Sequence, residues 1–210
     1  MILVASAIAF GSPSQAFGYS GSSAASYADS HWNICGVYHK FQCINDDCTA
    51  FVSEAMNAGG GYAQDTNGTV VKASTSDDTM WYMHYNPVRD QYYTSKSFTF
   101  VQDLRTFLIG DVPGGIDRGT KAGTSLAYDS GGDTGDVLFY NWDPAVPDGG
   151  SEPYDHANLI VGYGFSEDDY YGDYIDGHTN YRLHTYWTTR TYNAHVQTTV
   201  IDVMHISSTN

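Results

Sequence analysis

Basic residues are scarce in this chain of 210 residues, which has 9 Lys and Arg against 24 Asp and Glu and a formal net charge of −15. A surface this acidic repels phosphate backbones, so no nucleic acid is expected as a partner. Glutamate is rare as well, since only Glu54, Glu152 and Glu167 are present and the other acidic residues are Asp. Aspartate favours turns and caps over helix faces. With 41% hydrophobic residues, the chain can still form a buried core.

Long hydrophobic runs are absent beyond the first residues, so the sequence predicts no membrane-spanning helix. Residues 1–10 (MILVASAIAF) are apolar but too short to span a bilayer, and small polar residues follow up to Ala16. We interpret 1–16 as an export signal that lacks the usual basic start, with an N-terminal core strand as the alternative. The expectation is a secreted protein with a single domain over 17–210.

Metal-binding motifs are also missing. The cysteines form no CxxC pair and the histidines no HExxH helix, so neither a metal nor another cofactor is expected. A calcium-dependent adhesive domain is a third hypothesis, because several acidic residues lie close together late in the chain. They lack EF-hand spacing, and we interpret them as solvated turns: Asp168, Asp169, Asp173 and Asp176.

Helical patterns occupy the first half of the chain. Residues 23–33 suit a short helix, and a better defined helix begins at Cys48, after possible capping residues at 45–47. Its apolar residues recur at i, i+3, i+4, i+7 and i+8 and form one core-facing stripe: Cys48, Phe51, Val52, Ala55 and Met56. Glycines at 59–61 end it. Residues 98–109 predict a second long helix.

The second half has the composition of strands. Five segments rich in β-branched and aromatic residues are bounded by Gly, Asp and Pro: 136–142, 157–163, 170–177, 181–187 and 196–206. Residues 62–97 and 111–135 are expected to be irregular. Helices followed by consecutive strands predict an α+β fold, with N-terminal helices packed on a C-terminal antiparallel sheet.

Cys48 is the candidate nucleophile because it lies in the first turn of its predicted helix. The backbone N–H groups and the positive end of the helix dipole stabilise a thiolate there. A cysteine on an apolar stripe can equally be a small core residue. The catalytic interpretation therefore requires a base.

His156 is the candidate base, since it stands where a loop enters a predicted strand and can reach a helix start packed on the sheet. A hairpin centred near residue 167 would place His178 opposite His156, where His178, or Asn180 close by, could orient the imidazole. His184 is a weaker candidate for that role. The remaining histidines are interpreted as surface or structural residues: His31, His39, His84, His195 and His205.

These residues also carry a family resemblance. The segment 45–53 (NDDCTAFVS), followed by 58–60 (AGG), resembles the DCTNFVSQ…AGG signature of the Putative amidase domain family, a bacterial branch of the papain-like, NlpC-like cysteine peptidases. Further similarities in the same order extend over roughly 24–206. They include Trp81-Tyr82, 135–142, Asp155-His156 and His178-Thr179.

The resemblance implies a papain-like (NlpC-like) fold. It also implies a Cys48–His156 pair with a polar third residue, most simply His178, that hydrolyses an amide bond through a thioester. The sequence departs from the family where Ala50 replaces the usual Asn and where a longer segment, 143–154, precedes the histidine.

Oxyanion stabilisation requires hydrogen-bond donors aimed at the developing charge, and the backbone N–H of Cys48 is the default donor. Gln42 stands six residues before Cys48, the offset of the oxyanion glutamine in papain itself, although the NlpC-like branch does not generally use it. Asp47 is expected to cap the helix or orient the site.

An odd number of cysteines in an exported protein suggests one disulfide and one free thiol. We predict a disulfide between Cys35 and Cys43, which would hold the segment leading into the Cys48 helix. The alternative pair, Cys43 with Cys48, is disfavoured because the Cys48 side chain should point toward the core.

The leading hypothesis is therefore a secreted cysteine amidase or peptidase acting on a peptide or a peptidoglycan-like substrate. The alternative is a non-catalytic surface or binding protein on a degenerate papain-like fold. Contact between Cys48 and His156 would favour the enzyme, whereas separation of the two would favour the binding protein.

Overall fold

A computed structural model describes residues 18–34, 47–110, 114–145 and 153–207. The fold combines a few helices with one large antiparallel sheet, so the predicted α+β class is confirmed. Its helices are α1 (Gly21–His31), α2 (Cys48–Glu54), the π-helical turn η1 (Ala55–Gly59), α3 (Lys96–Thr99) and α4 (Val101–Gly110). No helix of the described segments is long and apolar enough to cross a membrane.

The main sheet has six strands in the order β3-β8-β4-β5-β6-β7, and all neighbouring strands run antiparallel. Its strands are β3 (Gly115–Ala122), β4 (Val137–Asn141), β5 (His156–Phe165), β6 (Tyr171–Gly177), β7 (Arg182–Tyr186) and β8 (Val200–Ile206). The five strands predicted in the second half are confirmed. The papain-like assignment remains a prediction.

Both faces of this sheet are covered, which the alternation along β4 illustrates. Val137 and Phe139 belong to the core shared with the helices, whereas Leu138 and Tyr140 belong to a second core on the other face. Trp187 anchors the second core and donates a hydrogen bond from Nε1 to the Ala127 carbonyl at 2.9 Å. The sheet is therefore a rigid support for groups at its strand ends.

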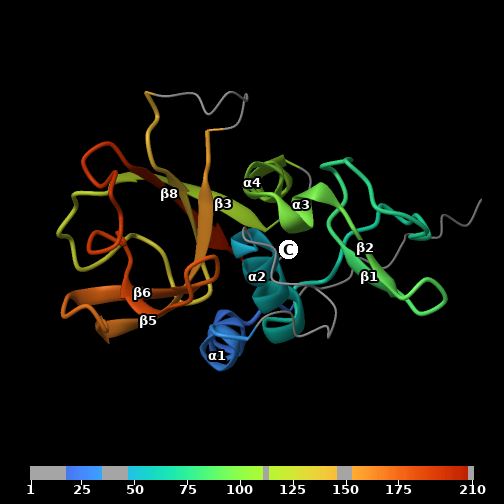
Figure 1. The fold of residues 1–210 in the computed structure, drawn as a ribbon, viewed down its shortest axis with the longest axis horizontal. Coiled ribbons are helices and arrows are strands. Elements are labelled where there is room, and N and C mark those ends of the chain that lie inside the picture. Colours follow the sequence, from blue (N-terminus) through green and yellow to red (C-terminus); the bar gives the residue numbers. More distant parts are fainter. Residues whose placement is uncertain (1–17, 35–46, 111–113, 146–152, 208–210) are drawn as a thin grey trace, which may run out of the picture.

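Helix α2 lies in the centre of the molecule, between the sheet and a small hairpin, with α1 alongside it (Figure 1). The predicted apolar stripe is confirmed, but every residue of α2 is buried, Ser53 and Glu54 included. Asp47 is the N-cap residue, as predicted, but its side chain makes no capping bond and lies instead against His178. Because α2 packs on β5, its first residue, Cys48, lies beside that strand.

Two predicted irregular regions contain strands. Residues 62–97 include the hairpin of β1 (Met83–Asn86) and β2 (Gln91–Thr94), and 111–135 includes β3. Strand β3 is at the sheet edge, mostly exposed and interrupted by an irregularity between Asp117 and Thr120, so its sequence shows no hydrophobic alternation. The helix predicted over 98–109 is divided at Phe100, whose backbone is extended.

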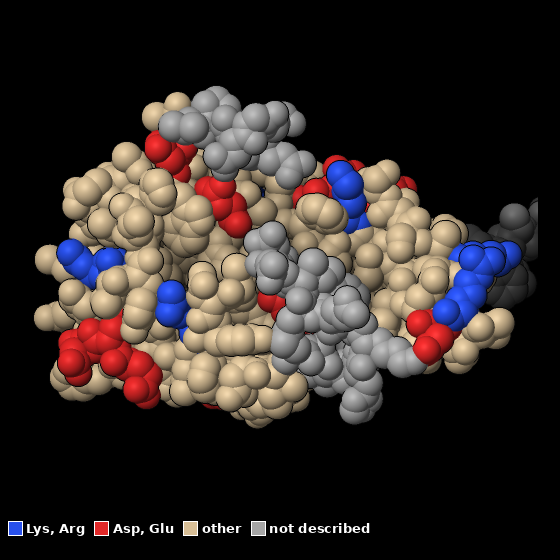
Figure 2. All heavy atoms as spheres, in the orientation of Figure 1, with Lys and Arg blue, Asp and Glu red and all other residues tan. Residues whose placement is uncertain are grey.

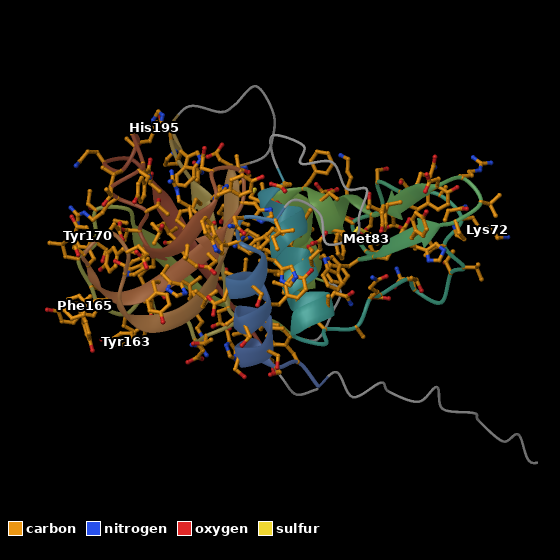
Figure 3. All side chains as sticks on the ribbon, turned by 60° about the horizontal axis from the view of Figure 1, so that its bottom comes forward. Lys72, Met83, Tyr163, Phe165, Tyr170 and His195 are labelled. Carbon is orange, nitrogen blue, oxygen red and sulfur yellow. The ribbon has the colours of Figure 1, made fainter. Side chains whose placement is uncertain are left out.

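The hairpin projects from the helices on the side opposite the main sheet. Figure 3 shows Met83 and Lys72 at that end of the molecule, and Tyr163 and Phe165 at the far end of the sheet. Buried Met80, Tyr82 and Tyr93 form its own small core. The hairpin thus lies apart from the strand ends that border Cys48.

Candidate active site

The Cys48 thiol is free and buried, with 6% of the residue exposed. The His156 imidazole and the backbone N–H of Ala157, which belong to the first two residues of β5, interact with the thiol closely enough to lower its pKa. The hydroxyl of Thr49 lies 3.8 Å from Sγ. The predicted nucleophile and base are therefore brought together where α2 begins and β5 begins.

Each member of this pair changes the titration of the other. Burial raises the pKa of Cys48, but the charge and hydrogen bond of His156 outweigh it and lower the pKa to about 7. Burial lowers the pKa of His156, whereas the charge and hydrogen bond of Cys48 raise it, with a net increase above the ordinary value. The two shifts favour a thiolate beside an imidazolium, a pair that titrates as a unit.

Asn158, which was not predicted from the sequence, orients the His156 imidazole. Its Oδ1 lies 3.0 Å from Nε2 of His156, and its side chain is fully buried. An amide oxygen only accepts, so Nε2 carries a proton and Nδ1 is directed to the thiol. The signal was available in the sequence, because residues two apart on a strand point to the same face.

Aromatic rings enclose the imidazole on its other sides. The ring of Trp142 lies nearly parallel to that of His156, with centroids 5.6 Å apart, and the ring of Tyr140 is 5.9 Å away. The backbone N–H of Trp142 donates to Asp155 at 2.7 Å, which holds the end of β4 against the residue before His156. The rings limit the hydration of the Cys48–His156 pair.

His178 does not contact His156 as predicted. Its Nδ1 lies 2.9 Å from the Asp47 carboxylate and its Nε2 lies 3.0 Å from the His31 carbonyl. Its ring stacks on Phe51 at 4.0 Å. Both hydrogen-bond partners are acceptors, so each ring nitrogen of His178 faces an oxygen. His178 joins the ends of α1 and α2 to β6.

The register of β5 and β6 explains this difference. The two strands pair Leu159 with Asp176 and Ile160 with Ile175, and the register shifts before Gly162 pairs with Tyr174. The predicted register, with position 156 opposite 178, is therefore displaced by one residue at the Leu159 end. Since successive side chains of a strand point to opposite faces, one residue is enough to redirect a side chain.

The other residues considered for the site do not contact His156 in the described structure. Asn180 lines the pocket, but no hydrogen bond joins it to His156 in the described structure. His184 pairs with Asp29 at 2.9 Å, away from the Cys48 thiol. His195, predicted as surface or structural, is exposed and lines the pocket, and Figure 3 shows it at the edge of the sheet region. Three candidates lie outside the described residues: Gln42, Cys35 and Cys43.

A pocket of about 290 Å³ opens over the pair, and its lining includes Cys48, His156 and Asn158 with Trp142, Arg182 and Tyr192. Two groups could offer three metal ligands each, Asp29 with Asp176 and His184, and Asp133 with Asp136 and His205, but neither belongs to this lining. Asp173 and Asp176 are buried in β6, which corrects their interpretation as solvated turns.

Comparison with known proteins gives one result. The family model described as Putative amidase domain matches residues 18–201, which include Cys48, His156 and Asn158. No curated protein and no solved structure matches the chain.

Proposed function

This chain belongs to the Putative amidase domain family, which indicates amide hydrolysis, and from that premise we propose a cysteine-dependent amidase or peptidase. The observation that carries the proposal is that Cys48 and His156 lie together in one pocket, where the charge of His156 and its hydrogen bonding lower the pKa of a buried thiol to about 7. A thiolate is the reactive form of cysteine, and a neighbouring histidine is its usual activator. Cys48 is therefore the nucleophile.

In the first step, the Cys48 thiolate attacks the carbonyl carbon of the amide and forms a tetrahedral intermediate. The His156 imidazolium then donates its Nδ1 proton to the amide nitrogen, the C–N bond breaks, and an amine leaves. The acyl group remains on Sγ as a thioester. Asn158 keeps the Nε2 proton in place, so the proton that moves is the one facing the thiol.

In the second step, His156, now neutral, accepts a proton from water through Nδ1, and the resulting hydroxide attacks the thioester. The C–S bond breaks, Cys48 leaves as a thiolate, and a carboxylic acid is released. The backbone N–H of Cys48, at the start of α2, is the proposed donor to the oxyanion in both steps.

We also propose that the protein is exported and acts on peptides, those of cell-wall peptidoglycan included. The apolar residues 1–10 and the sequence resemblance support this proposal. Trp142 and Tyr192 supply aromatic surface in the pocket, which suits a peptide ligand. Export is tested by N-terminal sequencing of protein recovered from the culture medium of a bacterial host, which should begin near residue 17.

The activity is tested by digesting purified peptidoglycan and a peptide library and identifying the new termini by mass spectrometry. Wild type should generate new termini, whereas Cys48→Ala and His156→Gln should not. His184→Gln is the matched control, because this histidine pairs with Asp29 outside the pocket. Cleavage that persists in a folded Cys48→Ala variant would overturn the cysteine mechanism. Absence of cleavage in wild type would favour the non-catalytic binding protein.

A further inference from the structure

We propose that Arg182 forms a carboxylate-binding subsite beside Cys48, so that the preferred substrates are amides or peptides with a carboxylate close to the scissile bond. This inference rests on the proposed function, since it names the substrate class for the same pocket.

Arg182 is the first residue of β7 and lines the pocket together with Cys48 and His156. A volume of about 290 Å³ is at the small end for ligand pockets, so a group bound to Arg182 lies near the thiol. The charge of Arg182 extends to the base as well, because burial and Arg182 both lower the pKa of His156. An anion at Arg182 would therefore be held next to the reacting atoms.

Within the described segments, Arg105 and Arg118 form ion pairs with aspartates, whereas the guanidinium groups of Arg89, Arg182 and Arg190 have no acidic partner. Of these three arginines, Arg182 is the one that lines the pocket. Figure 2 shows how sparsely basic side chains are distributed over one face. The guanidinium of Arg182 is therefore free to bind a carboxylate of a ligand.

The ring of Tyr192 fixes the guanidinium, whose Cζ lies 3.9 Å from the ring centroid. A cation–π contact of this kind uses the flat face of the group and leaves the N–H donors at its edge for other partners. Those donors match the two oxygens of a carboxylate. Tyr192 also lines the pocket, so the pair is a preorganised unit of the site.

Two other ionisable groups of the pocket already have partners. Asp155 accepts the backbone N–H of Trp142 at 2.7 Å, and His178 is held by Asp47 at 2.9 Å. Among the described pocket residues, Arg182 is the permanently charged group whose donors are unused. A carboxylate is the ligand that such donors select.

Alkylation of Cys48 measures this directly, without turnover. Iodoacetate and iodoacetamide differ in charge but carry the same reactive carbon, so their rate ratio at Cys48 reports the local attraction for a carboxylate. The rates are obtained on the full chain by mass spectrometry of the peptide that contains Cys48. Variants Arg182→Gln and Arg182→Lys are compared with Arg118→Gln, which removes a charge outside the pocket.

We expect Arg182→Gln to lower the iodoacetate-to-iodoacetamide ratio about threefold or more, Arg182→Lys to lower it less, and Arg118→Gln to leave it unchanged. In wild type, succinate but not succinamide should slow labelling by iodoacetamide at constant ionic strength. This measurement needs no variant and therefore covers the case of a misfolded Arg182→Gln.

Equal ratios in wild type and folded Arg182→Gln, or equal effects of succinate and succinamide, would overturn the subsite. Neither result depends on amide cleavage. Failure of the proposed function appears instead as the absence of Cys48-dependent hydrolysis, so the two outcomes are distinguishable.

Discussion

Gly177 lies directly against the side chain of Asn158, so closely that a Cβ atom at position 177 would be 1.8 Å from Oδ1 of Asn158. That oxygen is the one that accepts from Nε2 of His156. Gly177 ends β6, on the strand next to the imidazole. Because position 177 has no side chain, there is space for the Asn158 amide to contact His156.

Replacing Gly177 by Ala should displace Asn158 and leave the Nε2 proton of His156 without its acceptor. We expect kcat/KM to fall about tenfold or more, and the free energy of unfolding to fall by about 1–3 kcal/mol from overpacking. Gly110→Ala is the control, because a Cβ there meets no heavy atom within 4 Å. Wild-type activity of Gly177→Ala would show that Asn158 does not position the base.

Asn158 and His178 can be separated by substitution. Asn158→Ala should lower kcat by roughly one to two orders of magnitude, because His156 loses the partner that fixes its tautomer. It should also lower the pKa of His156 in the pH profile, since the Asn158 hydrogen bond raises that pKa. A merely structural role for Asn158 would leave the profile unmoved.

His178→Phe keeps an aromatic ring over Phe51 but removes both hydrogen bonds that join α1, α2 and β6. Leaving a buried hydrogen-bonding group without its partner costs about 1–3 kcal/mol, so we expect a loss of about 2 kcal/mol. Denaturant unfolding measures it. A folded His178→Phe should keep the pH profile of wild type, and a shifted profile would restore His178 to the catalytic unit.

The sequence was sufficient to predict that Cys48 and His156 lie together, because the placement of each depends on local patterns. A capped apolar stripe places Cys48 at a helix start, and a loop entering a β-branched run places His156 at a strand start. The helix–strand contact between α2 and β5 then joins them. The family signature extended the same reasoning to the rest of the chain.

The partner of His156 was mispredicted because register depends on tertiary structure. The strands turn about residue 168 and not 167, since Phe165 pairs with Tyr171, and the irregularity between Ile160 and Gly162 then changes the offset by one, so that the Leu159 end lies one position away from the predicted register. The edge strand β3 was also not predicted. Most of its residues are exposed on both faces, so hydrophobic and polar residues do not alternate along it. The contact between His156 and Asn158 could have been predicted, because both residues lie on one strand and their relative position does not depend on register.

The reactivity of Cys48 should follow the lowered pKa of its thiol. Labelling by iodoacetamide requires the thiolate, so the wild-type rate should rise with pH through a midpoint of about 7. In His156→Gln the burial that raises the pKa remains while its main opposing interaction is lost. The midpoint should then exceed the ordinary value of 9.0, and the rate at pH 7 should fall roughly 100-fold.

The labelling control is His184→Gln, which should keep the wild-type midpoint because His184 contacts Asp29 and not the thiol. An unchanged midpoint in His156→Gln would mean that the imidazole does not activate Cys48. No substrate is needed, so this measurement is independent of which amide the protein cleaves.

Glu54, buried in α2 near His178, should make the stability of the protein depend on pH. Burial raises its pKa from 4.5 to about 7, the charge of His178 partly opposes this, and Asp47 adds to it. Between these two values the folded chain holds a proton that the unfolded chain releases, so the free energy of unfolding decreases as pH rises. The decrease ends above pH 7 and amounts to on the order of 3 kcal/mol.

Glu54→Gln removes this titration and keeps a polar side chain of the same size. The free energy of unfolding is measured with urea at pH 5 and pH 8 for wild type and variant. The difference, variant minus wild type, should be larger at pH 8 than at pH 5 by on the order of 1–3 kcal/mol. Glu167→Gln is the control, because it makes the same chemical change at an exposed position outside the core. If wild type and Glu54→Gln respond equally to pH, Glu54 is ionised at both values, and its carboxylate is then stabilised by His178 strongly enough to offset burial.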